Sequence, residues 1–340
     1  MGRRRQRQMT LLDAFQQAQK NAIHHDACVA GSLQILEEHY NQDQLHVFLQ
    51  SFLDMFNRSL IVFKREPAVE RLIEFAVKFV AASTQADFFK AHRANSSISR
   101  GGAATDDEEE EGEEELGDEF VFMNAFIQHL VTISDAKDKA VRFRACQTLS
   151  KLMHALDEDA EIDDDIWEAL QEAMLKRIKD KVPVVRVQAI NALSRLQDPS
   201  DLDCPVIAEY RQRLTCDGSP DVRKAALIQV ALNKATIVDV VSRARDVKDV
   251  VRKALYAVLK DKLDLRALSI QSRLDLVRDG LNDRCDDVRV SCAKLVSQGW
   301  LELMQRDPAA LLDMLDVETD EKTCQLVADT LLDQGVCVRV

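Results

Sequence analysis

Arginine and aspartate recur at fixed spacing along this chain, and together they can form charge-assisted hydrogen bonds. A valine–arginine pair, followed three residues after the arginine by a small or apolar residue, occurs at Arg142, Arg186, Arg223, Arg252 and Arg289. In the last four copies an aspartate stands six residues before the arginine, at Asp180, Asp217, Asp246 and Asp283. The first copy has Ala136 at that place. Because a guanidinium offers a planar fork of donors that matches a carboxylate, the pattern predicts ion pairs.

Catalytic and metal-binding patterns are missing from the sequence. It contains no G-x-x-x-x-G-K, G-x-G-x-x-G, G-x-S-x-G or H-E-x-x-H, and its eight cysteines lie singly without a C-x-x-C. The acidic triplet at residues 163–165 is better placed to cap a helix start than to hold a metal. We therefore expect no enzyme activity, no cofactor, no metal site and no small-molecule substrate.

The elements that must position the arginines are amphipathic helices arranged in pairs. Successive valines of the pattern lie 44, 37, 29 and 37 residues apart, mostly near the roughly 40 to 47 residues of HEAT and armadillo units. Apolar residues follow each valine at plus four and plus eight, which places them on one side of a helix. The sequence thus predicts an all-α fold, an α-solenoid of HEAT repeats in which antiparallel helix pairs stack into a superhelix.

Composition divides the chain into five segments. We expect a basic N-terminal tail (1–8), N-terminal HEAT repeats (9–90), a disordered acidic insertion (91–119), further HEAT repeats (120–335) and an uncapped C-terminal end (336–340). Residues 106–119 carry 11 of the acidic side chains and no basic one, so removing them brings the formal charge from −13 to −2. The overall acidity therefore does not exclude an anionic partner.

Three interpretations of the acidic insertion stay open. It is a solvated spacer, or Thr105 and the acidic residues after it form a site for an acidophilic kinase. Alternatively, the acidic block mimics DNA and occupies basic residues elsewhere in the chain. The four arginines among residues 1–8 are likewise an import signal, a nucleic-acid contact or merely solvated. Because no apolar run is long enough to span a bilayer and no signal peptide is visible, we expect an intracellular, soluble protein without membrane contact.

Two roles are open to the repeated arginines, contact with DNA or architecture. An aspartate in the turn of a helix pair and an arginine on the first turn of the next helix can bond to each other, and stacking would align such pairs as a ladder. We predict a ladder of Asp180, Arg186, Asp217, Arg223, Asp246, Arg252, Asp283 and Arg289. Arg142 lacks the expected aspartate, although Asp135 and Asp138 are close enough to substitute for it. We therefore expect Arg142 and Arg144 to be freer to face a ligand.

Basic residues also gather in the turns that precede these helices. Near-equivalent places in four repeats hold Lys64 and Arg65, Lys137 and Lys139, Lys179 and Lys181, and Arg245 and Lys248. Together with Lys176, Arg177 and Lys253, they would form a basic track that is matched to phosphates and blind to base sequence. Such turns are also often only solvated.

Four long strings resemble the HEAT-repeat G subunits of condensin (CAP-G). They are KREPAVERLIEFAVKFV (64–80), VRFRACQTLSKLM (141–153), MLKRIKDKVPVVRVQAINALSRLQDP (174–199) and DVKDVVRKALYAVLKDKLDLRALSIQSRLDLVRDGLNDR (246–284). The resemblance implies a non-catalytic scaffold that binds a kleisin subunit (CAP-H type), and through it the SMC ATPases, and that holds double-stranded DNA in mitotic chromosome condensation. Family members are far longer, so the chain resembles their N-terminal portion.

The resemblance also implies where DNA is bound. The family's basic residues fall on Lys64 and Arg65 and around Arg142 and Arg144, and Lys176, Arg177, Lys179 and Lys181 are plausible additions. It further implies a location in the nucleus and on mitotic chromosomes, with a cytoplasmic pool in interphase. The alternative is a HEAT scaffold of the phosphatase or transport-receptor type, which binds proteins and not DNA.

Overall fold

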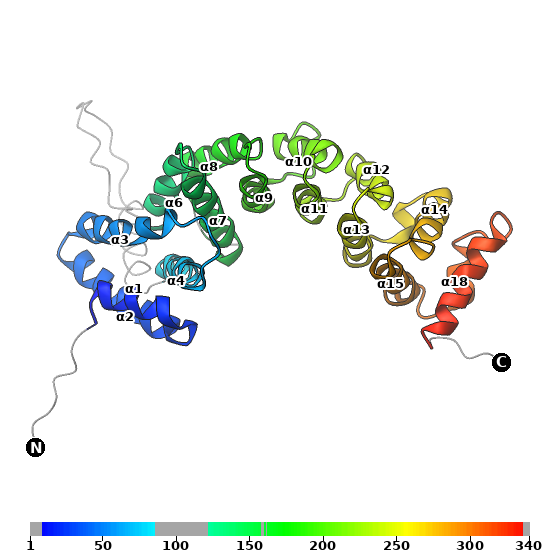
Figure 1. Cartoon of the computed structure of the whole chain (residues 1–340), viewed down its shortest axis with the longest axis horizontal. Coiled ribbons are helices and arrows are strands. Elements are labelled where there is room, and N and C mark those ends of the chain that lie inside the picture. The colour runs from blue at the N-terminus through cyan, green and yellow to red at the C-terminus, as the bar shows by residue number, and fades with distance from the viewer. Residues whose placement is uncertain (1–8, 86–121, 158–159, 161, 336–340) are drawn as a thin grey trace, which may run out of the picture. The chain divides into compact units, whose positions relative to one another are not determined.

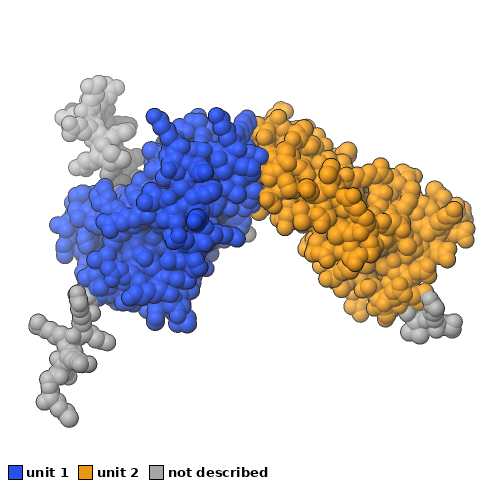
Figure 2. Space-filling model, viewed as in Figure 1, with its two compact units in different colours: residues 1–192 blue, residues 193–340 orange. Residues whose placement is uncertain are grey.

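The chain folds into antiparallel helix pairs in a computed structural model that describes residues 9–85, 122–157, 160 and 162–335. Within these residues every regular element is helical, which confirms the predicted all-α repeat fold. The chain forms two compact units, which meet between Ala192 and Leu193 in the sequence (Figure 2). The predicted tail at 1–8, the acidic insertion at 91–119 and the end at 336–340 lie outside the described residues.

The described part of the first unit consists of successive helix pairs (Figure 1). The second helices of neighbouring pairs pack on one another, α4 on α7 and α7 on α9. This is the stacking that a HEAT array requires, because one pair alone leaves its apolar stripe in water. The pairs are α1 (Leu11–Lys20) with α2 (His25–Asn41), joined by η1 (Ala22–His24); α3 (Leu45–Leu60) with α4 (Pro67–Ser83); α6 (Phe122–Ile133) with α7 (Lys139–Ala155); and α8 (Asp164–Arg177) with α9 (Pro183–Ala192).

The second unit repeats this scheme, and here α13 packs on both α11 and α15. After η2 (Leu193–Leu196), its pairs are α10 (Pro205–Cys216) with α11 (Pro220–Gln229), and α12 (Thr236–Val241) and η3 (Ser242–Arg245) with α13 (Asp249–Lys262). Following η4 (Leu265–Ala267) come α14 (Ile270–Leu281) with α15 (Asp286–Lys294), which continues through a π-helical turn (Leu295–Trp300) into α16 (Leu301–Leu303). The last pair is α17 (Pro308–Asp313) with α18 (Glu321–Asp333).

Proline marks where helices begin. Five of the six prolines in the chain are the first residue of an α-helix, in α4, α9, α10, α11 and α17. Proline has no N–H to donate, and the first N–H groups of a helix have no partner within it, so nothing is lost at this position. The prolines that open α4, α9 and α11 therefore fix the point at which the chain leaves each turn and enters the second helix of a pair.

The core combines the predicted aliphatic stripes with an aromatic cluster. The residues at plus four and plus eight from each pattern valine are all buried, as in Ala189 and Leu193 or Leu255 and Leu259. A cluster of phenylalanines in the first unit is not predicted by the repeat pattern. Phe52 lies at its centre, with ring centroids 5.1 to 5.8 Å from those of Phe15, Phe79, Phe122 and Phe126. These edge-to-face and stacked rings join α1, α3, α4 and α6 into one core.

Candidate nucleic-acid interface

The pattern arginines lie in the first turn of the second helix of each pair and reach in two directions. Nη1 of Arg223 donates to the carbonyl oxygen of Asp217, in its own pair, at 2.8 Å. Nε and Nη2 of the same side chain donate to the Asp246 carboxylate, in the next pair, at 2.8 and 2.7 Å. Arg252 repeats this geometry with the Asp246 carbonyl at 2.8 Å and the Asp283 carboxylate at 2.6 and 2.8 Å. Each of these guanidinium groups therefore bonds one helix pair to the next.

The remaining ladder arginines make the same bond within their own pair. Arg186 donates to the Asp180 carbonyl at 2.8 Å, and Arg289 donates to the Asp283 carbonyl at 2.6 Å. The sequence prediction paired each arginine with the carboxylate six residues earlier. In the structure that residue supplies its backbone oxygen, whereas for Arg223 and Arg252 the carboxylate comes from the following pair.

The ladder aspartates also hold the turn in which they lie. One carboxylate oxygen of Asp180, Asp217, Asp246 and Asp283 accepts the backbone N–H two residues further on, at 2.8 to 2.9 Å. The hydrogen bond from Arg252 lowers the pKa of Asp283 below its ordinary value. Burial alone would raise the pKa of Asp180 and of Asp246, but the bonds from Arg142 and Arg223 and from the backbone outweigh it, and both pKa values are lowered. The carboxylates of Asp180, Asp246 and Asp283 are therefore ionised at neutral pH.

A second arginine approaches three of these aspartates, and the sequence analysis missed this role. Arg177, Arg213 and Arg243 lie at the end of the preceding helix, 3.3, 3.8 and 3.5 Å from Asp180, Asp217 and Asp246 respectively. The signal in the sequence is an arginine three or four residues before the aspartate. A basic residue in the last turn of a helix also suits the helix dipole.

The expectation that Arg142 is free to face a ligand is wrong. Its Nε and Nη2 donate to the Asp180 carboxylate at 2.7 and 3.3 Å, and its Nη1 donates to the carbonyls of Ala136 and Lys137 at 3.0 and 2.8 Å. Ala136 serves as well as an aspartate there because only the backbone oxygen of that position is used. Arg142 is thus a ladder residue like the others.

Arg144 is not free either, because its side chain is completely buried. It bonds to backbone and side-chain oxygens of residues 62–70 and to Gln147. A side chain without exposed surface cannot touch a duplex, so Arg144 is removed from the candidate DNA contacts.

Lys176 and Arg177 both bond to Asp135, at 2.7 and 3.0 Å. Arg177 is also buried, so it is corrected from a candidate DNA contact to a support of the ladder. Lys176 stays exposed, but its charge is compensated by Asp135. In the second unit, the exposed Arg245 and Lys253 are likewise compensated by Asp279 and Asp287, each at 2.7 Å.

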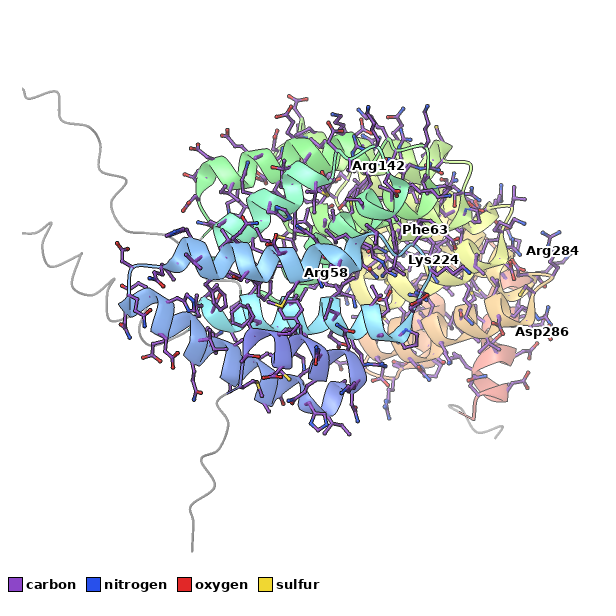
Figure 3. All side chains as sticks on the ribbon, turned by 60° about the vertical axis from the view of Figure 1, so that its left-hand side comes forward. Arg58, Phe63, Arg142, Lys224, Arg284 and Asp286 are labelled. Atoms are coloured by element: carbon purple, nitrogen blue, oxygen red, sulfur yellow. The ribbon has the colours of Figure 1, made fainter. Side chains whose placement is uncertain are left out.

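Six further exposed cations of the first unit lie on three successive turns. We call them the basic edge: Lys64, Arg65, Lys137, Lys139, Lys179 and Lys181. Phe63 and Arg142, both labelled in Figure 3, mark two links between these turns. Lys139 Nζ lies 5.1 Å from the centroid of the Phe63 ring, which joins the first turn to the second, and the Arg142–Asp180 bond joins the second to the third. The edge also carries acidic side chains, among them the exposed Glu66 and Asp138.

In the second unit the equivalent turns border two polar hollows. One has a volume of about 400 Å³ and is lined by Arg243, Arg245 and Lys248. The other has a volume of about 590 Å³ and is lined by Arg245, Arg278 and Arg284. Aspartates line both hollows, so the positive charge of their arginines and lysine is compensated. Among the described residues no helix can cross a membrane, and no His, Cys, Asp and Glu cluster fits a metal ion.

Comparison with known proteins gives a specific match. The chain is 39% identical to condensin complex subunit 3 of Homo sapiens over 289 residues, which is 85% of this chain and 26% of that protein. It is 39% identical to the Xenopus laevis protein of the same name over 311 residues, 91% of this chain and 28% of that protein. This chain is a homologue of condensin complex subunit 3. It spans about a quarter of the length of these curated relatives.

The fold agrees with this assignment. The crystal structure of the S. pombe condensin Cnd3–Cnd2 subcomplex matches with a TM-score of 0.75 and 26% identity, over 96% of this chain and 38% of the matched one. No protein-family model matches the chain. The resemblance to condensin G subunits is confirmed, whereas the residues that contact DNA stay a prediction.

The ladder bonds should stabilise the stack strongly. We expect Arg252→Ala to lower the free energy of unfolding by about 3–5 kcal/mol, because it leaves a buried carboxylate without its partner. Urea denaturation monitored by circular dichroism measures this loss. The control is Arg306→Ala, which removes an exposed arginine that pairs with Glu302 one turn away. We expect little or no change there, and an equally small effect of both substitutions would contradict a structural role for the ladder.

Proposed function

We propose that this chain is a non-catalytic HEAT-repeat subunit of condensin that binds double-stranded DNA without sequence preference and acts with a kleisin partner in mitotic chromosome condensation. Homology to condensin complex subunit 3 supports the subunit role. The match to the Cnd3–Cnd2 subcomplex supports the kleisin partner, Cnd2 in that structure, through which the SMC ATPases would be engaged. The nucleus and mitotic chromosomes are the corresponding location, with a cytoplasmic interphase pool.

The basic edge carries the DNA part of the proposal. Its six cations come from three turns that neighbouring helix pairs bring together, so they form a row instead of a scattered set. Lysine side chains offer point charges to phosphate oxygens and read no base pattern. Because the ladder neutralises the arginines behind them, the edge supplies the accessible positive charge of this face.

Charge reversal on the basic edge should abolish most DNA binding. We expect a variant with Lys64, Arg65, Lys137 and Lys181 changed to Glu to bind a mixed-sequence duplex far more weakly, since each lost phosphate contact removes about 0.9 from the slope of log K against log salt. Fluorescence anisotropy at several salt concentrations measures both quantities. It is carried out on the full chain and on a variant lacking residues 105–119, which also tests whether the acidic block occupies the edge.

The matched control changes four cations that lie outside the edge to Glu, namely Lys20, Arg58, Lys78 and Lys322, which alters the net charge by the same amount. If this control loses as much affinity and slope as the edge variant, binding depends on net charge and not on the edge. If neither the full chain nor the shortened one binds DNA in a salt-dependent way, the DNA role fails.

The rival function is a protein-binding HEAT scaffold, for which partner binding is independent of DNA. A pull-down of the chain with a fragment of the kleisin subunit, with and without duplex DNA, separates the two. We expect the kleisin to be retained and DNA to be recovered with the complex, with less DNA recovered for the edge variant. Retention of the kleisin with no DNA in the complex would favour the rival.

A further inference from the structure

Arg144 is a fully buried arginine, and three of its four side-chain hydrogen bonds go to the first turn of the basic edge or to the helix that follows it. Nε donates to the Val62 carbonyl at 2.8 Å and Nη2 donates to the Lys64 carbonyl at 2.7 Å. Nη1 donates to Glu70 Oε1 at 2.5 Å and to Gln147 Oε1 at 2.7 Å. Since the side chain of Arg144 belongs to α7, it ties the turn of one helix pair to the second helix of the next.

Glu70 and Gln147 complete this cluster. Gln147 Nε2 donates to the second oxygen of Glu70 at 3.0 Å, and Lys151 Nζ lies 3.7 Å from the same oxygen. The Glu70 carboxylate is held between donors from α7, and burial, which would raise its pKa, is outweighed by these partners, so its pKa is lowered. Glu70 is therefore the counter-charge of the buried Arg144 guanidinium.

The clamped turn is the one that presents Lys64 and Arg65. The Lys64 carbonyl accepts two bonds, from Arg144 and from the Glu66 N–H at 2.9 Å, so the backbone at this point is held from both sides. The Phe63 ring packs on Phe143 of α7 with centroids 5.6 Å apart. The side chains of Lys64 and Arg65 remain exposed.

We propose that Arg144 is a positioning residue for DNA binding, which holds the Lys64–Arg65 turn in place through two backbone carbonyls and never touches the duplex. The inference rests on the proposed DNA-binding function and deepens it. A turn fixed in advance loses less conformational entropy when its side chains meet phosphates, so affinity depends on the clamp. Two arginines two residues apart thus have different tasks, because Arg142 bonds forward to the third turn and Arg144 bonds back to the first.

Substitution of Glu70 tests the clamp, by which we mean the hydrogen bonds from Arg144 to the Lys64–Arg65 turn. Net charge and the clamp predict opposite changes in DNA affinity for this substitution. Glu70→Ala removes a negative charge close to the basic edge, so simple electrostatics predicts tighter DNA binding. The clamp predicts weaker binding, because Arg144 loses its counter-charge. Glu74→Ala is the matched control, since Glu74 is an exposed acid one turn further along the same helix, and we expect its affinity to be unchanged or slightly higher. Equal strengthening by both substitutions would overturn the clamp.

Arg144→Lys and Arg144→Gln complete the experiment, each alone and combined with Lys64→Ala and Arg65→Ala. We expect both Arg144 variants to weaken binding, Lys included, because an ammonium keeps the charge but not the planar fork that reaches two carbonyls. In the background that lacks Lys64 and Arg65, we expect no further loss, as in a double-mutant cycle of coupled residues. The exchange rate of the backbone amide hydrogens of residues 61–66 should rise in the Arg144 variants. It should not rise in the variant that lacks only Lys64 and Arg65.

The outcomes separate the two proposals. If the Lys64 and Arg65 variant binds DNA as well as the unaltered chain, the proposed DNA contact at this turn fails. The positioning role alone is overturned if Arg144→Lys binds DNA with unchanged affinity. It is also overturned if the Lys64 and Arg65 variant binds more weakly and an Arg144 substitution in that variant causes the same further loss of affinity as it does in the unaltered chain. Circular dichroism melting of each variant shows whether it is folded, and the Glu70 comparison still decides the question if Arg144→Gln does not fold.

Discussion

The fold depends on arginine side chains that bond two helix pairs at once. Burial of apolar stripes drives the pairs together, but this force is non-directional and would tolerate small slips between neighbours. A guanidinium that donates to a carbonyl of its own pair and to a carboxylate of the next fixes the distance and register at each junction, as Arg142, Arg223 and Arg252 do. The same aspartate accepts a backbone N–H from the loop in which it lies. One carboxylate therefore fixes both the loop between two helices and the stacking of neighbouring pairs.

This arrangement separates the positive charges of the chain into two sets. Arginines at the start of the second helices, and others at the end of the first, are buried or half-buried and matched by aspartates. Lysines in the intervening turns are exposed to water. The stacking that brings successive aspartates and arginines into contact also brings successive turns side by side, so a row of exposed cations is a by-product of the ladder. This is the physical basis for an edge that suits a phosphate backbone.

The sequence was sufficient for the all-α repeat fold, because the fold depends on periodicity. It showed which arginines and aspartates recur, but not which of their atoms bond to each other. It failed at Arg142, Arg144 and Arg177, and the reason is the same in each case. Spacing along one repeat shows which side chains are near each other within it, but the partners of these arginines include residues of a neighbouring repeat and backbone carbonyls. Asp180 is 38 residues from Arg142, and the Val62 carbonyl is 82 residues from Arg144. Glu70, which follows Val69 at the place where the pattern would have an arginine, is the half-buried partner of Arg144.

In the proposed DNA-binding surface the contacts come from exposed turn lysines and not from the pattern arginines. Acetylation of individual lysines by a chemical reagent, with and without a bound duplex and resolved by mass spectrometry, tests this surface residue by residue. We expect slower modification of Lys64, Lys137 and Lys181 in the presence of DNA, with unchanged rates at Lys20 and Lys322. Equal protection of all five lysines, or protection of Lys20 and Lys322 alone, would contradict it.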